Sequence, residues 1–355
     1  MFTRCRFFKK FAWLFITTVT IILGLWGWYS FRIIRFNCVP SSSSCTSESK
    51  LSQLPEEFGT QQETVINVIR KSPASFNSSY ATESKRKSLN HKTSLITTTT
   101  CVQHYFLLIL VSSAPSNVER RKDLRQTWGV DFAIRPRWKT AFLVARTQMK
   151  SELDSLLEEE DEIYGDLVRA NHYEHYWNQT LKIQMGFEWA AKYCKFSFLL
   201  KIDDDVFVNT KALITLLMNP ETPKQKLYMG NRYEAAPVHR SGKWEVTFKE
   251  YSRTHYPDFC PGFGYVLSAD VVVLFVDLFD VVSAFRLDDV YVGMLADKAA
   301  VKTIHNDGFI VGPEQVTQCI LQNNTLVWHG IFGNCLFEVY NQIMIEANIR
   351  LTVRD

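Results

Sequence analysis

The sequence predicts an α/β fold in which helices cover both faces of a largely parallel sheet. Two observations support this prediction. Short apolar runs alternate with helical patterns through residues 101–355, and this alternation is typical of parallel strands joined by helical crossovers. The chain is also long enough to bury a large core, because 46% of its 355 residues are hydrophobic and 14% are aromatic.

The first strand and helix are expected near the start of this region. Residues 104–111 form an apolar run that predicts a buried strand. In the segment that follows, Ser116 and Glu119 have the spacing of a capping box. Gly129 is a helix stop signal, so the helix is expected to end before it.

Further units of the same kind follow. Residues 140–145 repeat the strand pattern and residues 148–162 repeat the helical one. Residues 180–192 predict a helix that leads into a strand at residues 196–202. The strand and the helix therefore recur often enough to build a sheet with crossovers.

The N-terminus carries a candidate membrane span at residues 11–31, which are 21 residues without a charge. A cleaved signal peptide is the alternative, but its apolar region would be only about 7–15 residues long. Basic residues favour a cytoplasmic tail at residues 1–10, because two follow the span closely and four precede it, namely Arg4, Arg6, Lys9 and Lys10. We therefore expect a single-pass type II signal anchor.

Residues 32–100 are rich in Ser, Thr, Lys, Asn and Glu and are expected to form a flexible stem. Beyond the span lie seven cysteines and three glycosylation sequons, at Asn77, Asn178 and Asn323. Both features favour a lumenal, oxidising location, with most cysteines in disulfides and at least one thiol free or paired between chains. The alternatives are chance sequons and small buried cysteines.

The overall charge gives no sign of a nucleic-acid partner, because a net charge of +3 from 40 basic and 37 acidic residues is small for this length. The function must be sought in local sites, of which the triplet Asp203, Asp204 and Asp205 is the clearest. It follows the strand predicted at residues 196–202, and ligands of α/β sheets bind at the carboxyl ends of strands. Clustered carboxylates there indicate a divalent cation. The alternative is a solvated acidic turn before a helix that begins at Thr210.

Five short segments also follow one another in the order found in a known family. They resemble motifs of the β-1,3-glycosyltransferases of glycosyltransferase family 31, the group of galactosyl- and N-acetylglucosaminyltransferases. The segments are RRKDLRQTWG at 120–129, YWNQTLK at 176–182, KIDDDVFVN at 201–209, YPDFCPGFGYVLS at 256–268 and LDDVYVG at 287–293.

The resemblance implies a Golgi membrane enzyme with a lumenal catalytic domain at residues 101–355 and a Rossmann-type fold like that of GT-A transferases. Such an enzyme is metal-dependent and inverting. It moves a hexose, with galactose as our first choice, from a UDP-sugar to a glycoprotein or glycolipid in a β-1,3 linkage. Transfer of N-acetylglucosamine or N-acetylgalactosamine stays an alternative. A non-catalytic sugar-binding protein on the same scaffold and an unrelated metal-dependent hydrolase are alternatives of other classes.

The resemblance also assigns site residues. Asp205 matches the direct Mn²⁺ ligand, and Asp203 and Asp204 would face the ribose, the sugar or supporting partners. His329 lies where the family carries a histidine after an apolar strand, so it is a candidate second ligand, with a structural role as the alternative. Asp289 matches the catalytic base. Its alternative is a capping role with Asp288, which replaces the family's glutamate, at a helix over residues 290–298.

The remaining candidates are donor-binding residues. Arg121 and Arg125 lie four residues apart on one helix face and are expected to contact the donor's phosphates or uracil, with a solvated basic face as the alternative. Gly262 and Gly264 are expected to let the backbone approach donor or acceptor closely. Trp244 is either a sugar-stacking or a core aromatic residue.

Overall fold

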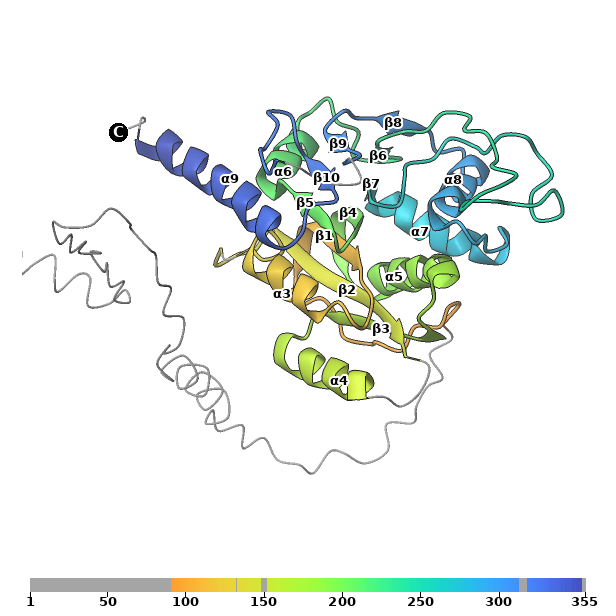
Figure 1. Ribbon diagram of the computed structural model, residues 1–355, viewed down its shortest axis with the longest axis horizontal. Coiled ribbons are helices and arrows are strands. Elements are labelled where there is room, and N and C mark those ends of the chain that lie inside the picture. The colour runs from red at the N-terminus through yellow and green to blue at the C-terminus, as the bar shows by residue number, and fades with distance from the viewer. Residues whose placement is uncertain (1–90, 132, 148–151, 313–317, 353–355) are drawn as a thin grey trace, which may run out of the picture. The chain divides into compact units, whose positions relative to one another are not determined.

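The computed structural model describes residues 91–131, 133–147, 152–312 and 318–352 (Figure 1). Within these ranges no helix is both long and apolar enough to cross a membrane. The predicted tail and span, most of the predicted stem, and Asn77 lie outside the described residues.

The centre of the structure is a seven-stranded sheet with the order β3-β2-β1-β4-β7-β6-β8. Its pairs β2–β3, β1–β2, β1–β4 and β6–β8 are parallel, and β7 is antiparallel to both of its neighbours. The predicted, largely parallel sheet is thus confirmed. The strands are β1 His104–Ser112, β2 Trp138–Arg146, β3 Leu167–Tyr173, β4 Lys195–Asp203, β6 Tyr228–Gly230, β7 Gly264–Ser268 and β8 Thr303–His305.

A second, three-stranded sheet lies next to the carboxyl end of β4. Its order is β5-β10-β9, with β10 antiparallel to β5 and parallel to β9. The strands are β5 Val206–Val208, β9 Phe309–Ile310 and β10 Val327–His329. Because β5 begins directly after the aspartate triplet, this small sheet brings the C-terminal part of the chain to the triplet.

Helices cover both faces of the large sheet, as predicted (Figure 1). Alternate residues of β1 point to opposite faces: Leu107 and Ile109 belong to a core shared with α3, α4, α6 and α9, and Leu108 and Leu110 to a core shared with α5, α7 and α8. The helices are α3 Val118–Gln126, α4 Glu152–Tyr164, α5 Gln179–Tyr193, α6 Thr210–Met218, α7 Ala269–Asp277, α8 Asp288–Lys298 and α9 Asn334–Thr352.

The start of α3 differs from the predicted capping box. Asn117, not Ser116, is the residue before the first turn, and its side chain makes no capping bond. The Asn117 amide instead donates a hydrogen bond to the Asp204 carboxylate, 2.8 Å away. A contact with the aspartate triplet therefore replaces the local cap.

The folded unit begins earlier than residue 101, because residues 91–100 pack against it. The buried Glu188 carboxylate accepts hydrogen bonds from the backbone N–H groups of Lys92 at 2.7 Å and Thr93 at 2.9 Å. Leu95 is buried and forms a bridge with Ala170 of β3. Residues within the last part of the predicted stem thus contact the folded unit. The Thr-rich composition of residues 91–100 did not indicate these contacts, because their partners lie far away in the sequence.

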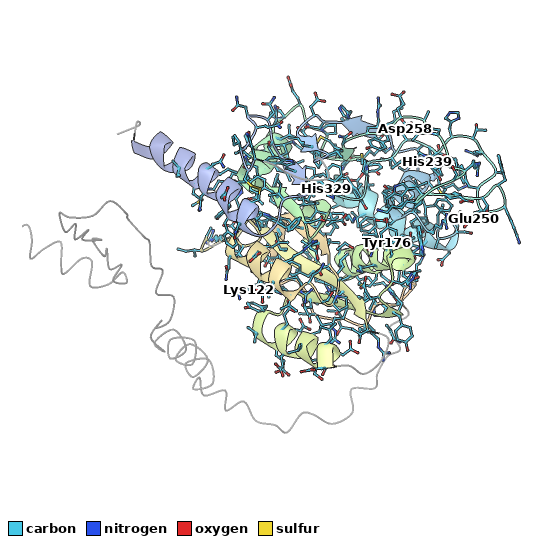
Figure 2. All side chains as sticks on the ribbon, viewed as in Figure 1. Lys122, Tyr176, His239, Glu250, Asp258 and His329 are labelled. Atoms are coloured by element: carbon cyan, nitrogen blue, oxygen red, sulfur yellow. A yellow bond between two sulfur atoms is a disulfide. The ribbon has the colours of Figure 1, made fainter. Side chains whose placement is uncertain are left out.

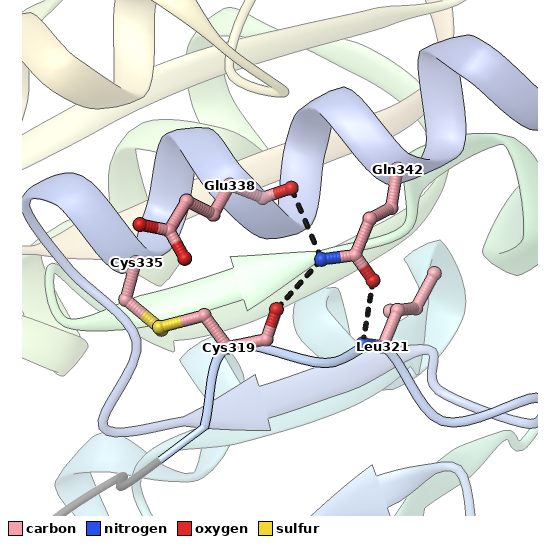
Figure 3. The surroundings of a disulfide bond; sticks show 5 residues. All are labelled: Cys319, Leu321, Cys335, Glu338 and Gln342. Atoms are coloured by element: carbon pink, nitrogen blue, oxygen red, sulfur yellow. Dashed lines mark hydrogen bonds between the residues drawn. A yellow bond between two sulfur atoms is a disulfide. The ribbon is translucent and has the colours of Figure 1, made fainter.

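Four of the five cysteines in the described ranges form disulfides, Cys101–Cys194 and Cys319–Cys335. The second ties the loop before β10 to the start of α9. Further along α9, the Gln342 amide donates to the Cys319 carbonyl oxygen (Figure 3). Cys260 is free and buried, and burial raises the pKa of its thiol to about 12. The free thiol is thus protonated and unreactive near neutral pH.

Candidate active site

The aspartate triplet lies at the carboxyl edge of the sheet, where the sequence placed it. Asp203 is the last residue of β4 and pairs with Ser112 at the end of β1. The Asp205 carbonyl oxygen accepts hydrogen bonds from the N–H groups of Gly330 and Ile331, both at 2.9 Å. These bonds hold the segment after β10 beside the triplet.

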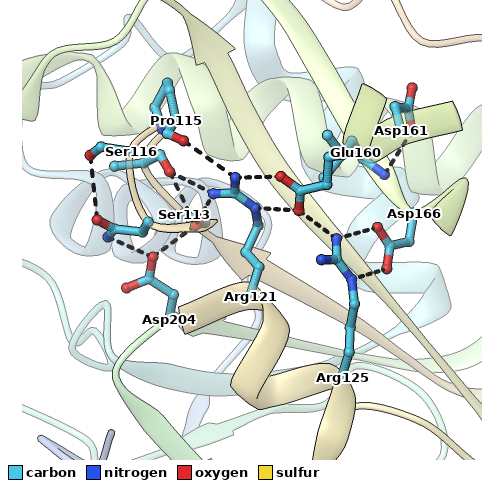
Figure 4. A network of polar contacts seen from close by, with 12 residues as sticks. Ser113, Pro115, Ser116, Arg121, Arg125, Glu160, Asp161, Asp166 and Asp204 are labelled. Atoms are coloured by element: carbon cyan, nitrogen blue, oxygen red, sulfur yellow. Dashed lines mark hydrogen bonds and ion pairs between the residues drawn. The ribbon is translucent and has the colours of Figure 1, made fainter. Parts of the chain in front are cut away.

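Asp204 is buried, and its carboxylate binds three side chains of the segment at residues 113–120. Its side chain is 7% exposed, and one carboxylate oxygen accepts from Ser113 Oγ and Asn117 Nδ2, both at 2.8 Å (Figure 4). The other oxygen accepts from Arg120 Nη1 at 2.8 Å. Of the roles that the resemblance implied for Asp204, these contacts support that of a supporting partner.

Asp205 and His329 form the candidate metal pair. Asp205 Oδ1 is buried without a hydrogen-bond partner among the described residues, and it lies 3.7 Å from His329 Nε2. A carboxylate oxygen left without a donor beside an imidazole nitrogen fits a divalent cation such as Mn²⁺. Within the described ranges no three His, Cys, Asp or Glu residues gather in a group that could hold a metal. Such a cation often keeps water and substrate phosphate oxygens in its remaining positions.

Lys201 connects the aspartate triplet to Asp288, the neighbour of the candidate base. Its side chain is 1% exposed, and Nζ contacts Asp203 Oδ1 at 2.9 Å, Asp288 Oδ2 at 3.5 Å and the Gly262 carbonyl oxygen. Burial disfavours the ammonium, but Asp203 and Asp288 raise the pKa of Lys201 overall, so the side chain is charged at neutral pH. Sequence reasoning gave this residue no role. The available signal was a lysine inside an otherwise apolar strand.

Asp289 lies in the first turn of α8 and has an unusually high pKa. Its Oδ1 accepts a hydrogen bond from the N–H group of Val290 at 2.8 Å. Burial and the nearby Asp288 together raise the pKa of Asp289 to about 7, although the Val290 N–H group and Lys201 oppose the shift. Such a carboxyl group is suited to take up a proton near neutral pH. The contact with Val290 shows that the same side chain also stabilises the helix start.

Asp203 shows the same effect to a smaller degree. Burial raises the pKa of Asp203 to about 6, although Lys201 lowers it. A nearby cation would favour the ionised carboxylate. Two acids with raised pKa values and one buried cation therefore gather at one edge of the sheet, which is typical of a functional site.

The structure does not support the donor-binding roles predicted for Arg121 and Arg125. Arg121 is fully buried and binds Glu160 through Nε and Nη2, at 2.8 and 2.6 Å (Figure 4). Arg125 binds both Glu160 and Asp166 at 2.7 Å. Both guanidinium groups thus hold α3 to α4 and to the start of β3. They form a buried network, not the solvated basic face of the alternative.

Arg120 is the arginine of α3 that lies beside the triplet. Its Nη1 lies 2.8 Å from Asp204 and 3.5 Å from Asp205. Its guanidinium also lies 4.7 Å from the ring centre of Phe332, which follows β10. Consecutive residues of a helix point in different directions, and the sequence alone did not show which arginine would face the site.

The two glycines have different surroundings. The Gly262 carbonyl oxygen accepts from Lys201, and a Cβ atom at Gly262 would lie 3.4 Å from Asp288 Oδ2. Gly262 therefore borders the site. A Cβ atom at Gly264 would come within 2.8 Å of Val327 Cγ1, so this glycine permits close packing of β7 on β10.

The first turn of α5 also contacts the segments around the site. Lys182 is buried and binds Glu174 Oε1 at 2.7 Å and the Ser113 carbonyl oxygen at 3.0 Å.

Asn178 is half-buried, and its amide donates to the Tyr173 carbonyl oxygen at 3.0 Å. Asn323 is exposed in the loop before β10. Of the two described sequons, only the one at Asn323 has an exposed asparagine.

Comparison with known proteins gives consistent matches. The sequence model of the family described as Galactosyltransferase matches residues 119–307, a range that contains both acidic groups but not His329. Beta-1,3-galactosyltransferase 1 of mouse (Mus musculus) is 33% identical over 249 residues, which cover 69% of this chain and 76% of that protein, and the human protein (Homo sapiens) gives the same values. Beta-1,3-galactosyltransferase 5 of Pan paniscus is 31% identical over 200 residues, covering 56% of this chain and 66% of that protein.

Among solved structures, a glycosyltransferase involved in the glycosylation of the major capsid of PBCV-1 aligns with 63% of this chain and 92% of its own. The TM-score is 0.28 and the identity 15%, which are too low to support an argument.

Proposed function

Since this chain belongs to the galactosyltransferase family, glycosyltransferase family 31, and is therefore a glycosyltransferase, we propose that it forms β-1,3 linkages by an inverting transfer from a UDP-sugar. Galactose is the donor sugar we propose, because the relatives named above are galactosyltransferases. The acceptor is a sugar hydroxyl of a glycoprotein or glycolipid. The observation that carries the proposal is that the buried Lys201 contacts both Asp203 of the triplet and Asp288, the neighbour of Asp289, while Asp205 of the same triplet lies 3.7 Å from His329.

Asp205 and His329 would hold the metal, which we propose to be Mn²⁺. When bound, the cation offsets the negative charge that develops on the departing diphosphate. The chain's own part is to present the free oxygen of Asp205 toward it, and Asp204 fixes the triplet by its bonds to Ser113 and Asn117.

Asp289 performs the proton transfer in the proposed reaction. The acceptor hydroxyl oxygen forms a bond to the anomeric carbon of the donor while the bond from that carbon to UDP breaks. Asp289 takes the hydroxyl proton in the same step. A single displacement inverts the carbon, so an α-linked donor gives a β-linked product. The role requires Asp289 to be ionised, and Lys201 favours that state because it lowers the pKa of Asp289.

An assay with a panel of donors tests the proposal. The full-length protein in detergent is incubated with Mn²⁺, a β-galactoside or β-N-acetylglucosaminide acceptor, and UDP-galactose, UDP-N-acetylglucosamine or UDP-N-acetylgalactosamine. We expect β-1,3 transfer from UDP-galactose. Transfer from another donor alone would contradict the choice of sugar. Binding of sugars without transfer from any donor would favour a non-catalytic protein.

The substitution Asp205→Asn is expected to weaken metal-dependent UDP binding by about 10-fold or more, because even indirect partners of a metal contribute that much. The fold should survive, since asparagine has nearly the same volume as aspartate. Calorimetry of UDP binding with and without Mn²⁺ measures the effect. Asp307→Asn, at an aspartate whose side chain is 94% exposed, is the matched control. Equal Mn²⁺ dependence in both variants would exclude Asp205 as a ligand.

We also propose a type II orientation in the Golgi membrane, on the basis of the basic residues before residues 11–31. If the orientation is right, Asn323 is lumenal and, being exposed, available for an N-glycan. Endoglycosidase treatment of the membrane-expressed protein should increase its mobility, and Asn323→Gln should reduce that shift. A C-terminal tag cleaved by protease from the cytosolic side would show the opposite orientation.

A further inference from the structure

The long connection between β6 and β7, residues 231–263, is packed onto the helix that carries Asp289. Val238, Val246, Tyr256 and Phe259 form a small core with Val290 of α8. Backbone bridges between Tyr233 and Phe259 and between Pro237 and His255 close the connection on itself. The loop is thus a defined structure fixed to α8, although it has no helix of its own.

This loop presents an aromatic side chain at a tight turn. Gly242 has φ +86°, which side-chain-bearing residues rarely adopt, and its carbonyl oxygen accepts from the N–H group of Glu245 at 3.1 Å. The turn exposes Trp244, whose ring centre lies 5.8 Å from that of Tyr176, with 37° between the ring planes. Both side chains keep much of their surface open, at 39% exposure for Trp244 and 49% for Tyr176.

Tyr176 and Trp177 form a pair immediately before α5, with ring centres 4.9 Å apart and nearly perpendicular planes. We call Tyr176, Trp177 and Trp244 the aromatic platform. Figure 2 shows Tyr176 beside α5, and His239 and Glu250 in the long loop. The platform therefore joins two segments that are far apart in the sequence.

Two contacts place the platform beside the segment that precedes the candidate base. The Arg286 guanidinium lies 4.7 Å from the ring centre of Trp177, and Thr180 Oγ1 donates to the Phe285 carbonyl oxygen. Phe285 and Arg286 come just before Asp288 and Asp289 in the chain. In agreement, burial and the nearby charges of Asp288 and Asp289 raise the pKa of Tyr176 to about 12.

Open aromatic surface beside charged catalytic groups is unusual unless a ligand covers it. A pyranose ring fits such a surface, because its C–H groups form an apolar face and its hydroxyls stay at the rim. Aromatic side chains with one polar end suit this mixture of contacts. The donor is expected at the Asp205–His329 pair, so the platform is left for the second substrate.

We propose that the aromatic platform binds the terminal pyranose ring of the acceptor and positions its hydroxyl for Asp289. The inference rests on the proposed function and adds the acceptor subsite to it. Tyr176, Trp177 and Trp244 are positioning residues in this assignment. The recognised unit is the sugar ring itself, whether a protein or a lipid carries it.

The test compares Trp244→Ala with Trp244→Phe in the full-length protein. Loss of one stacking partner should raise the acceptor KM by about 3- to 10-fold, while kcat and the affinity for UDP with Mn²⁺ change little. Trp244→Phe should recover most of the loss, because it restores an aromatic face. Phe248→Ala is the matched control, because Phe248 is exposed in the same loop but packs on Arg240. It should leave the acceptor KM unchanged.

A binding experiment separates the subsite from the reaction. Saturation-transfer NMR with methyl β-galactopyranoside and methyl N-acetyl-β-glucosaminide should show contact with the ring protons in the wild type and loss of signal in Trp244→Ala. This holds even if no transfer occurs with any donor. An unchanged signal and an unchanged acceptor KM would overturn the inference. Weaker UDP binding with an unchanged acceptor KM would assign the platform to the donor.

The carrier of the sugar ring is distinguished in the same kinetic assay. A glycopeptide and a detergent-dispersed glycolipid are compared as acceptors for Trp244→Ala. An equal rise of KM for both supports recognition of the ring alone. A rise for only one would show that Trp244 contacts that carrier, which contradicts the assignment to the ring.

Discussion

Replacing Asp289 by asparagine is expected to lower kcat by about 10²- to 10⁴-fold, which is the usual contribution of a general base. The affinity for UDP should stay close to that of the wild type, because the proton is transferred only as the new bond forms. Asparagine keeps the oxygen that accepts from Val290, so the start of α8 is preserved. Steady-state kinetics, UDP calorimetry and thermal melting together measure the effect.

The pH dependence gives an independent check on Asp289. Because burial and Asp288 raise the pKa of Asp289 to about 7, the group takes up a proton as the pH falls through that value. A base works only when ionised, so kcat/KM of the wild type should fall on the acid side of about pH 7. Asp288→Asn removes one cause of the shift and should move this limb to lower pH. Near-normal turnover in Asp289→Asn would remove it from the catalytic role.

The raised pKa of Asp289 also has a consequence for stability. An aspartate with a folded-state pKa above its usual value binds more protons in the folded than in the unfolded protein, between its usual pKa and about 7. Its contribution to the free energy of unfolding therefore falls as the pH rises through this window. The site thus maintains an unfavourable charge that catalysis requires, and Lys201 reduces the cost.

The predicted strands and the position of the triplet agree with the structure because they depend on local patterns. The apolar runs that became β1, β2 and β4 are buried on both faces, and an acidic residue after such a strand lies at the sheet edge wherever the partner strands are. The match of Asp289 to the start of a helix was equally local.

Contacts with partners far away in the sequence could not be predicted. The guanidinium groups of Arg121 and Arg125 pair with the carboxylates of Glu160 and Asp166, which lie 35 to 41 residues further along the chain. The start of the folded unit was missed because its partner is Glu188, about a hundred residues away. Periodicity and composition contain no information about such pairs, so only the folded chain shows them.

Lys201 also received no role from the sequence alone. Its replacement is expected to have the largest effect on the free energy of unfolding. Lys201→Met removes the positive charge that contacts Asp203 and Asp288. Breaking a buried ion pair from one side costs about 3–5 kcal/mol, because the remaining charges lose their partner. Methionine keeps a similar length, so most of the loss is electrostatic. Urea unfolding near pH 7 measures the difference in the free energy of unfolding.

The pH dependence of this variant separates charge from packing. The pKa of Lys201 is raised above its usual value, so its charge is constant below about pH 10 and only the carboxylates titrate. As the pH falls toward 5 the carboxylates left by Lys201→Met take up protons, and the loss of stability should shrink. A loss that is constant over this range would indicate a packing defect.

The acid limb of kcat/KM should also move in this variant, toward higher pH. Lys201 lowers the pKa of Asp289, so its removal should raise that pKa and shift the acid limb of kcat/KM to higher pH. Lys182→Met is the matched control, because Lys182 is also buried and paired, with Glu174. It should destabilise the fold without moving the limb. An unmoved limb in Lys201→Met would show that this lysine supports the fold but does not adjust the acidity of the base.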